Sequence, residues 1–193
     1  MARKLSLLLL VIVLTTATSF AETFQIDPEH TQINFSIKHL VFFTVQGNFK
    51  DFSGSIQADP ENKILIAATA TIQATSVDTG KDKRDNYLRG EDFFDVKQYP
   101  EIHFKSKNVT GSGNDITMVG DITIKEITKE IVLKGTFLGI TLDPQGKLRA
   151  KFTATGIINH QDFKLRGENP TKTGKLAIGD EVKIRLEVES VMQ

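Results

Sequence analysis

The side chains that most often carry chemistry are scattered through this sequence. Its four histidines, His30, His39, His103 and His160, do not occur at spacings that place two metal ligands on one face of a helix or strand. The chain has no cysteine, its serines lie outside any nucleophile-elbow motif, and no glycine-rich phosphate loop opens a helix. The sequence therefore predicts no enzyme, no catalytic residue and no cofactor. It also predicts no metal site, although ligands from distant parts of the chain could still assemble one.

Charged side chains concentrate in one segment, residues 78–98, which carries five basic and six acidic residues. The segment does not alternate between apolar and polar positions, and it predicts a short helix near Lys81 to Arg89 followed by a loop. A long ordered connection in a compact domain is often a lid or a binding loop. A solvated surface helix is the other interpretation, and the residues alone favour neither.

The overall charge excludes one class of partner. The chain has 24 basic and 24 acidic residues and a net charge of zero. No basic block is present that could follow a phosphate backbone, so we expect no nucleic-acid partner.

The elements that would position a site are strands, because apolar and polar residues alternate along most of the chain. Turn residues separate the runs, and short connections between consecutive runs indicate antiparallel neighbours. Many long strands with one apolar face either curl into a barrel or split into a sandwich. The alternation predicts eight strands, at about residues 31–42, 45–58, 63–77, 101–110, 114–125, 129–142, 147–160 and 180–191.

The second of these strands changes phase in its middle. Phe49 is in step with Val45, whereas Phe52 is in step with Ile56. A bulge near Lys50 and Asp51 would return both phenylalanines to one face and bend the strand, as barrel corners require.

Phenylalanine is unusually common on the predicted inward faces, where it is mixed with small residues. Phe137 shares its face with Gly135, and Phe152 shares its face with Ala150 and Ala154. Such a mixture can pack into a solid core. It can also leave a long apolar cavity, which an eight-stranded barrel is just wide enough to enclose. In the second case, Gly135, Ala150 and Ala154 are where a tunnel would need space.

The N-terminus predicts export. Arg3 and Lys4 precede an apolar run at residues 5–14, and small residues at Ser19 and Ala21 fit a cleavage site. The run of about ten residues is too short for a permanent membrane span, so a retained anchor is the weaker alternative. We expect a signal peptide at residues 1–21, cleavage after Ala21 and one domain at residues 22–193. A cysteine-free exported chain suits the bacterial periplasm, and we expect no integral membrane protein.

Several motifs together resemble the YceI-like family, whose members are exported lipocalin-like barrels that bind polyisoprenoids and related long-chain lipids. The resemblance covers about residues 24–191. It rests on Asp27-x-x-His30-Thr31-x-Ile33-x-Phe35-x-Ile37-x-His39-Leu40, Arg84-Asp85-x-Tyr87-Leu88, Asp92-Phe93-Phe94-Asp95, Tyr99-Pro100-x-Ile102-x-Phe104, Gly120-Asp121-Ile122-Thr123-Ile124-Lys125-x-Ile127-Thr128-Lys129, Asn159-x-x-Asp162-Phe163 and Gly179-Asp180-Glu181-Val182.

The resemblance implies an all-β fold, a single antiparallel eight-stranded lipocalin-like barrel with one helix or loop excursion at about residues 78–98. It implies a periplasmic carrier of a long-chain isoprenoid or other lipid, and a homodimer is one state that stays open. Two alternatives stay open: a stress-related structural binding module whose lipid is incidental, and an enzyme of unrecognised type.

For a lipid carrier, inward-facing residues supply the candidate cavity wall. His39 is in phase with the inward residues of its strand near a barrel rim, where it would be either a core histidine or a ligand contact. A polar lipid head would need donors or a cation at the mouth, and Arg84 with Tyr87 is the candidate pair. The predicted wall consists of Phe35, Ile37, His39, Phe49, Phe93, Phe94, Phe104, Phe137 and Phe152.

Overall fold

The computed structural model describes residues 21–39, 43–165 and 178–193. The predicted signal peptide lies almost wholly outside these residues, so export and cleavage after Ala21 stay predictions.

Eleven strands, one α-helix and two short 3₁₀ helices make up the described chain. The predicted helix near residues 81–89 is confirmed as α1 (Asp82–Arg89). The strands are β1 (Glu22–Ile26), β2 (Gln32–His39), β3 (Phe43–Phe49), β4 (Phe52–Asp59), β5 (Ile64–Gln73), β6 (Val77–Asp78), β7 (Glu101–Ser112), β8 (Asp115–Ile124), β9 (Ile127–Leu142), β10 (Leu148–Asn159) and β11 (Ile178–Met192), and the 3₁₀ helices are η1 (Ala74–Ser76) and η2 (His160–Phe163).

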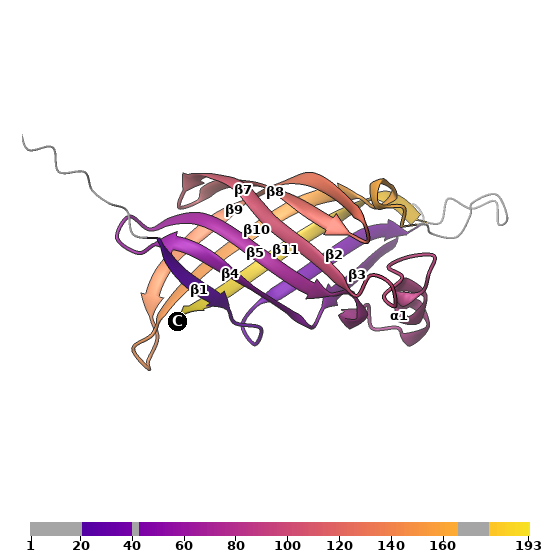
Figure 1. The fold of residues 1–193 in the computed structure, drawn as a ribbon, viewed down its shortest axis with the longest axis horizontal. Coiled ribbons are helices and arrows are strands. Elements are labelled where there is room, and N and C mark those ends of the chain that lie inside the picture. The colour runs from indigo at the N-terminus through magenta and orange to yellow at the C-terminus, as the bar shows by residue number, and fades with distance from the viewer. Residues whose placement is uncertain (1–20, 40–42, 166–177) are drawn as a thin grey trace, which may run out of the picture.

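The strands form one antiparallel sheet that closes into a barrel (Figure 1). The ring runs β1-β4-β5-β7-β8-β9-β10-β11, and β11 pairs back with β1. β2 pairs with the earlier part of β11 and with β3, so β1 with β2 and β3 with β4 each act as one bent strand of the ring. The prediction of a single eight-stranded antiparallel barrel is confirmed.

Two local predictions need correction. The expected bulge at Lys50 and Asp51 is a full break between β3 and β4. There Lys50 donates to the Ser76 carbonyl and the Asp51 carbonyl accepts from Gln73 N–H, so the chain turns a barrel corner. The sequence reasoning also missed β1, whose five residues are too few for the alternation to stand out.

The start of β5 faces opposite to the predicted direction. Alternation along residues 63–77 predicts that Ile64 and Ile66 share the inward face with Ala68, but both isoleucines are exposed, whereas Leu65 is buried. The pairing of β4 with β5 shifts register so that Ala58 lies opposite Leu65 and Gln57 opposite Ala67. Ile66 is therefore the extra residue of a bulge, which reverses the inward phase on its two sides.

One half of the barrel interior, the solid end, is filled by side chains. Here the solid end means Phe24, Leu65, Phe137 and Ala150, all at most 4% exposed. They come from β1, the start of β5, the end of β9 and the first half of β10. α1 lies at the opposite end of the barrel (Figure 1).

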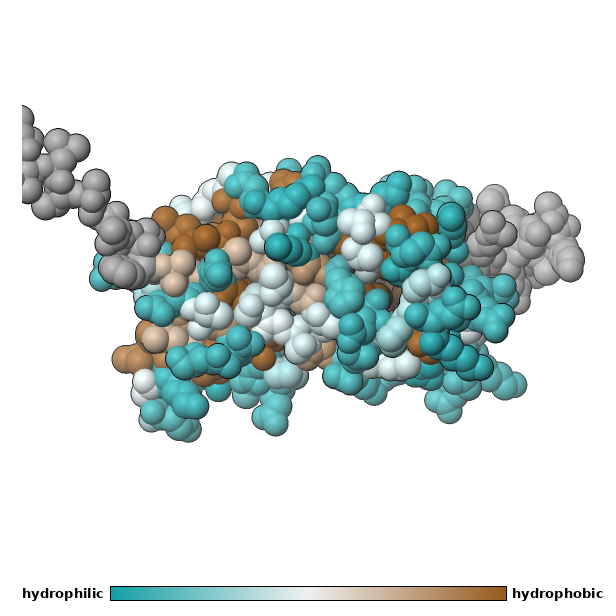
Figure 2. Space-filling view, in the orientation of Figure 1, coloured by the Kyte–Doolittle hydropathy of each residue, from teal (hydrophilic) through white to brown (hydrophobic). Residues whose placement is uncertain are grey.

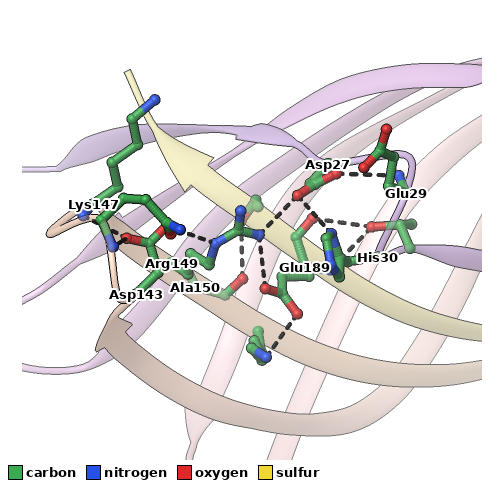
Figure 3. Close-up of polar contacts among 12 residues, drawn as sticks. Asp27, Glu29, His30, Asp143, Lys147, Arg149, Ala150 and Glu189 are labelled. Atoms are coloured by element: carbon green, nitrogen blue, oxygen red, sulfur yellow. Dashed lines mark hydrogen bonds and ion pairs between the residues drawn. The ribbon is translucent and has the colours of Figure 1, made fainter.

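An ion-pair cluster joins four segments on the outer side of the solid end (Figure 3). Arg149 on β10 pairs with Asp27 after β1, Asp143 in the β9–β10 turn and Glu189 on β11, at 2.7, 3.0 and 2.8 Å. Only 20% of the Arg149 side chain is exposed. The cluster ties both termini of the barrel sequence to one hairpin, so it fixes the closure of β1 on β11.

The cluster holds its carboxylates in the charged form. Burial pushes the pKa values of Asp27 and Glu189 upward. The hydrogen bonds that each carboxylate accepts together outweigh burial, from Arg149 and His30 at Asp27 and from Lys151 and Arg149 at Glu189, so both pKa values lie below their usual range. Backbone donation from Lys147, together with Arg149, lowers the pKa of Asp143. The three carboxylates in turn raise the pKa of Arg149.

The visible outer surface is hydrophilic or neutral over most of its area (Figure 2). Apolar atoms gather mainly at the end away from α1, where exposed side chains include Ile64, Leu138 and Leu142. Among the described residues, no helix is long and apolar enough to cross a membrane.

Candidate ligand-binding cavity

The half of the barrel next to α1 is hollow. It contains a cavity of about 510 Å³, within the range of about 300–1,000 Å³ typical of small-molecule sites. Inward side chains of the barrel strands form most of its wall, including Ile33, Ile72, Ile102, Ile122, Ile131, Val182, Ile184 and Leu186.

Most of the predicted wall residues lie on this cavity: Phe35, Ile37, Phe49, Phe93, Phe94, Phe104 and Phe152, together with the predicted head-group pair Arg84 and Tyr87. Phe137 does not line it. It is 4% exposed and belongs to the solid end, opposite Phe152 across the β9–β10 pair. The His39 side chain lies outside the described part of the structure, so its placement stays a prediction.

The small residues expected to leave room for a tunnel are packed instead. Ala150 is buried in the solid end, Ala154 is buried between Phe152 and Ile158 on β10, and neither alanine is part of the cavity wall. A Cβ on Gly135 would meet backbone atoms of Thr153 and Ala154. The small residues that do line the cavity are Ala68 and Ala70 on β5. The period of alternation predicts which face of the strand a residue lies on, but it does not predict the residue's position along the barrel axis. That position contributes to whether an inward side chain packs in the core or lines the cavity.

Glycines beside the cavity make room for its aromatic rings. Gly47 lies opposite Phe35, and a Cβ on Gly120 would come within 2.6 Å of Phe104 Cζ on the neighbouring strand. Each ring therefore lies over a position that has no side chain. This explains why large and small residues alternate across strands without filling the interior.

The segment around α1 covers the hollow end with aromatic side chains. Tyr87 and Phe93 have ring centroids 6.3 Å apart, Phe93 and Phe94 are 5.1 Å apart edge to face, and Phe94 lies 5.9 Å from Phe49 of β3. Phe93 and Phe94 are each 8% exposed. Of the two interpretations of residues 78–98, a solvated surface helix does not describe a segment with these buried rings.

Two arginines of α1 fasten the helix to the segment before it, residues 75–79. Arg84 Nε donates to Thr79 Oγ1 at 2.7 Å and its Nη2 to the Thr79 carbonyl at 2.9 Å. Arg89 donates to the carbonyls of Thr75 and Val77 at 2.7 and 2.8 Å. Asp85 is 4% exposed and accepts from the Thr79 backbone N–H. The predicted cation of the head-group pair is thus already partly used in holding the helix.

The end of the covering segment is fastened to the barrel rim. The Tyr99 hydroxyl hydrogen-bonds the carboxylate of Glu126 in the β8–β9 turn, which raises the pKa of Tyr99 and lowers that of Glu126. The segment is therefore bound to the barrel at both of its ends.

Wall residues that the sequence reasoning did not place include Lys83, His160 and Leu165. His160 had a detectable signal, because it continues the inward series of Ala154 and Ile158 on β10 by two residues. Lys83 had none, since a helix of eight residues surrounded by charges does not show which face meets the barrel.

The cavity is chemically simple. Its polar wall side chains are few, namely Thr31, Asn34, Thr69, Lys83, Arg84, Tyr87 and His160, against a large apolar majority. Among the residues with described positions, no three histidine, aspartate or glutamate side chains are grouped to hold a metal ion. Such a cavity suits an apolar molecule with at most a small polar end.

A closed antiparallel barrel with an internal apolar cavity places this chain in the class of lipocalin-like barrels. Residues 24–190 match the YceI-like domain. The chain therefore belongs to the YceI-like family.

Known relatives agree with this assignment. The chain is 35% identical to protein YceI of Escherichia coli O17:K52:H18 over 184 residues, which is 94% of this chain and 93% of that protein. A crystal structure of the Campylobacter jejuni YCEI protein superposes with a TM-score of 0.70 at 32% identity, covering 81% of this chain and 90% of that one. The same fold occurs in a domain from Saccharophagus degradans described as a polyisoprenoid binding domain, with a TM-score of 0.69, 15% identity and coverage of 88% and 98%.

Proposed function

We propose that this protein is a periplasmic carrier that holds a long-chain apolar lipid, a polyisoprenoid or similar, inside the barrel without catalysing a reaction on it. The observation that carries the proposal is the 510 Å³ apolar cavity beneath α1. Each CH₂ group that leaves water for such a cavity contributes about 0.8 kcal/mol. A long hydrocarbon chain can therefore bind tightly with few directed contacts.

The covering segment fits this use. Tyr87, Phe93 and Phe94 close the hollow end with apolar rings, while Lys83 and Arg84 bring positive charge to the same place. A lipid whose chain fills the barrel would have its polar end close to these cations. The Saccharophagus degradans domain, described as polyisoprenoid binding, shares the fold, and an architecture of this kind can enclose a chain of that type.

The periplasmic location is part of the proposal and rests on the N-terminal sequence. An exported carrier would meet lipids in a compartment where a free isoprenoid chain is almost insoluble. Intact-mass measurement of the exported protein should give a chain that begins at Glu22. A mass that includes residues 1–21 would overturn the location.

The lipid itself can be identified by native purification. Protein isolated from its own periplasm without detergent should release a long-chain lipid into organic solvent, detected by mass spectrometry. Purified protein should then bind a fluorescent isoprenoid in a saturable manner with one site per barrel. A protein that carries no lipid and does not bind the probe would refute the carrier proposal.

A further inference from the structure

Among the described residues of the cavity wall, one buried side-chain polar atom has no hydrogen-bond partner, Nε2 of His160. His160 is 4% exposed, and Nε2 has almost no solvent contact and no hydrogen bond within the described chain. Buried nitrogen atoms are nearly always hydrogen-bonded, so an unpartnered one beside a binding cavity calls for an explanation.

The other ring nitrogen fixes the state of this one. Nδ1 lies 2.7 Å from the carbonyl oxygen of Leu165. A carbonyl oxygen can only accept, so Nδ1 carries the proton in this contact. In the neutral ring, Nε2 then has a lone pair and accepts a hydrogen bond. The Leu165 carbonyl therefore sets His160 as an acceptor toward the cavity.

The surroundings hold the ring in this orientation. Phe93 stacks on the imidazole with ring centroids 6.3 Å apart and planes 23° apart. Leu165 is 3% exposed, and its backbone N–H donates to the His160 carbonyl, so the two residues are joined twice. The ring is thus fixed on one face and at one edge, and a ligand group would meet its remaining edge.

We infer that His160 selects lipids whose polar end carries a hydrogen-bond donor, such as a long-chain alcohol, over lipids of equal length that lack one. This inference rests on the proposed function, because it names the class of head group that the same cavity takes. An alcohol O–H would satisfy Nε2 and leave no buried polar atom unpaired. An ether in the same position has only acceptor oxygen, so Nε2 would stay unpaired beside it.

Two probes with one chain length test the selection. In the methyl ether of geranylgeraniol a methyl group replaces the hydroxyl hydrogen, which removes the donor and leaves the chain unchanged. The affinities of both probes for the full mature protein can be measured by competition against a fluorescent isoprenoid. One neutral hydrogen bond predicts that the alcohol binds about three- to tenfold more tightly.

Two substitutions assign the selection to Nε2. In His160→Asn, the amide nitrogen can still donate to the Leu165 carbonyl, but nothing reaches the position of Nε2. In His160→Gln, the longer amide can reach that position. We expect H160N to fold and bind both probes equally, and we expect H160Q to keep part of the preference for the alcohol.

The outcomes separate this inference from the proposed function. If the wild-type protein binds both probes with equal affinity, or if H160N keeps the full preference, the inference is wrong while the carrier proposal stands. If neither probe binds, the carrier proposal fails first. Unfolding of H160N monitored by circular dichroism shows whether the variant is folded. If it is not, the ratio for H160Q decides. A preference for the alcohol that is smaller than in the wild-type protein but still present supports the inference, and a preference equal to that of the wild-type protein overturns it.

Discussion

The two halves of this barrel are built from the same strands and the same residue types, but one is packed and the other is hollow. At the solid end, Phe24 and Phe137 are 0 and 4% exposed and fill the interior together with Ala150. At the hollow end, Phe35 and Phe104 lie over glycines and line a cavity instead. The difference lies in where the rings are placed, since both halves contain phenylalanine next to small residues.

The two ends of the barrel also differ in the polar contacts that hold them together. The solid end is fastened by Arg149 and its three carboxylates, which join both ends of the barrel sequence. The hollow end is covered by a separate segment that is held by hydrogen bonds from Arg84 and Arg89 to strand and loop carbonyls. In a barrel that carries a ligand, one packed half can stabilise the fold while the other half remains hollow and binds the ligand.

The largest expected effect comes from removing one ring from each half. Phe24→Ala should lower the free energy of unfolding by about 3–5 kcal/mol, because a fully buried ring leaves a cavity behind. Phe104→Ala should cost no more than about half of that, because part of this ring already faces empty space. Urea unfolding of both variants measures the difference. Equal losses would mean that the two halves are packed alike.

Adding a ring to each half should give the opposite pair of results. Ala150→Phe overfills the solid end and should cost about 1–3 kcal/mol of stability, with little change in lipid affinity. Ala70→Phe places the ring in the cavity, so the melting temperature should hold while binding of a fluorescent isoprenoid falls. Thermal unfolding and titration of both variants provide the comparison. Loss of stability in Ala70→Phe with unchanged binding would contradict the carrier proposal.

The Arg149 cluster predicts how the solid end responds to acid. The pKa values of Asp27, Asp143 and Glu189 are lowered in the folded protein. Groups of this kind stabilise the fold above their unfolded pKa values, 3.8 for aspartate and 4.5 for glutamate. That contribution is lost as the pH falls through the lower folded values. The melting temperature should therefore drop steeply below about pH 4.5.

Removing the arginine tests the origin of this acid sensitivity. In Arg149→Met the three carboxylates repel one another, so the melting temperature at neutral pH should be lower than in the wild-type protein. The additional decrease in melting temperature on acidification should be smaller than in the wild-type protein. Arg185→Met is the matched control, because Arg185 pairs with Glu187 on the surface and is 70% exposed. Its acid profile should match that of the wild-type protein. An unchanged profile in Arg149→Met would place the sensitivity elsewhere.

The sequence predicted the barrel because alternation and turn residues are local signals, and seven of nine predicted wall residues lie on the cavity. It placed Phe137 wrongly because residues on the inward face of β9 can reach either half of the barrel. It missed the reversal at Ile66 because a bulge arises from pairing between strands. The sequence did not predict that Nε2 of His160 lacks a partner, because this depends on the position of the Leu165 carbonyl beside the ring.

The smallest expected effect concerns charge at the hollow end, where two arginines of one helix provide a matched pair. Both Arg84 and Arg89 hydrogen-bond to the segment before α1, but only Arg84 lines the cavity. Arg84→Ala should therefore weaken binding of an anionic lipid such as geranylgeranyl phosphate by about three- to tenfold, and binding of geranylgeraniol by less. We expect a small loss of affinity because Thr79 already accepts hydrogen bonds from two of the guanidinium donors.

Arg89→Ala removes similar contacts with backbone carbonyls away from the cavity, so it should affect both lipids equally. Competition titrations of the two lipids against both variants give the four affinities. If Arg84→Ala weakens both lipids to the same degree as Arg89→Ala does, Arg84 serves only to hold the helix, and the polar end of the lipid is recognised elsewhere on the cavity wall.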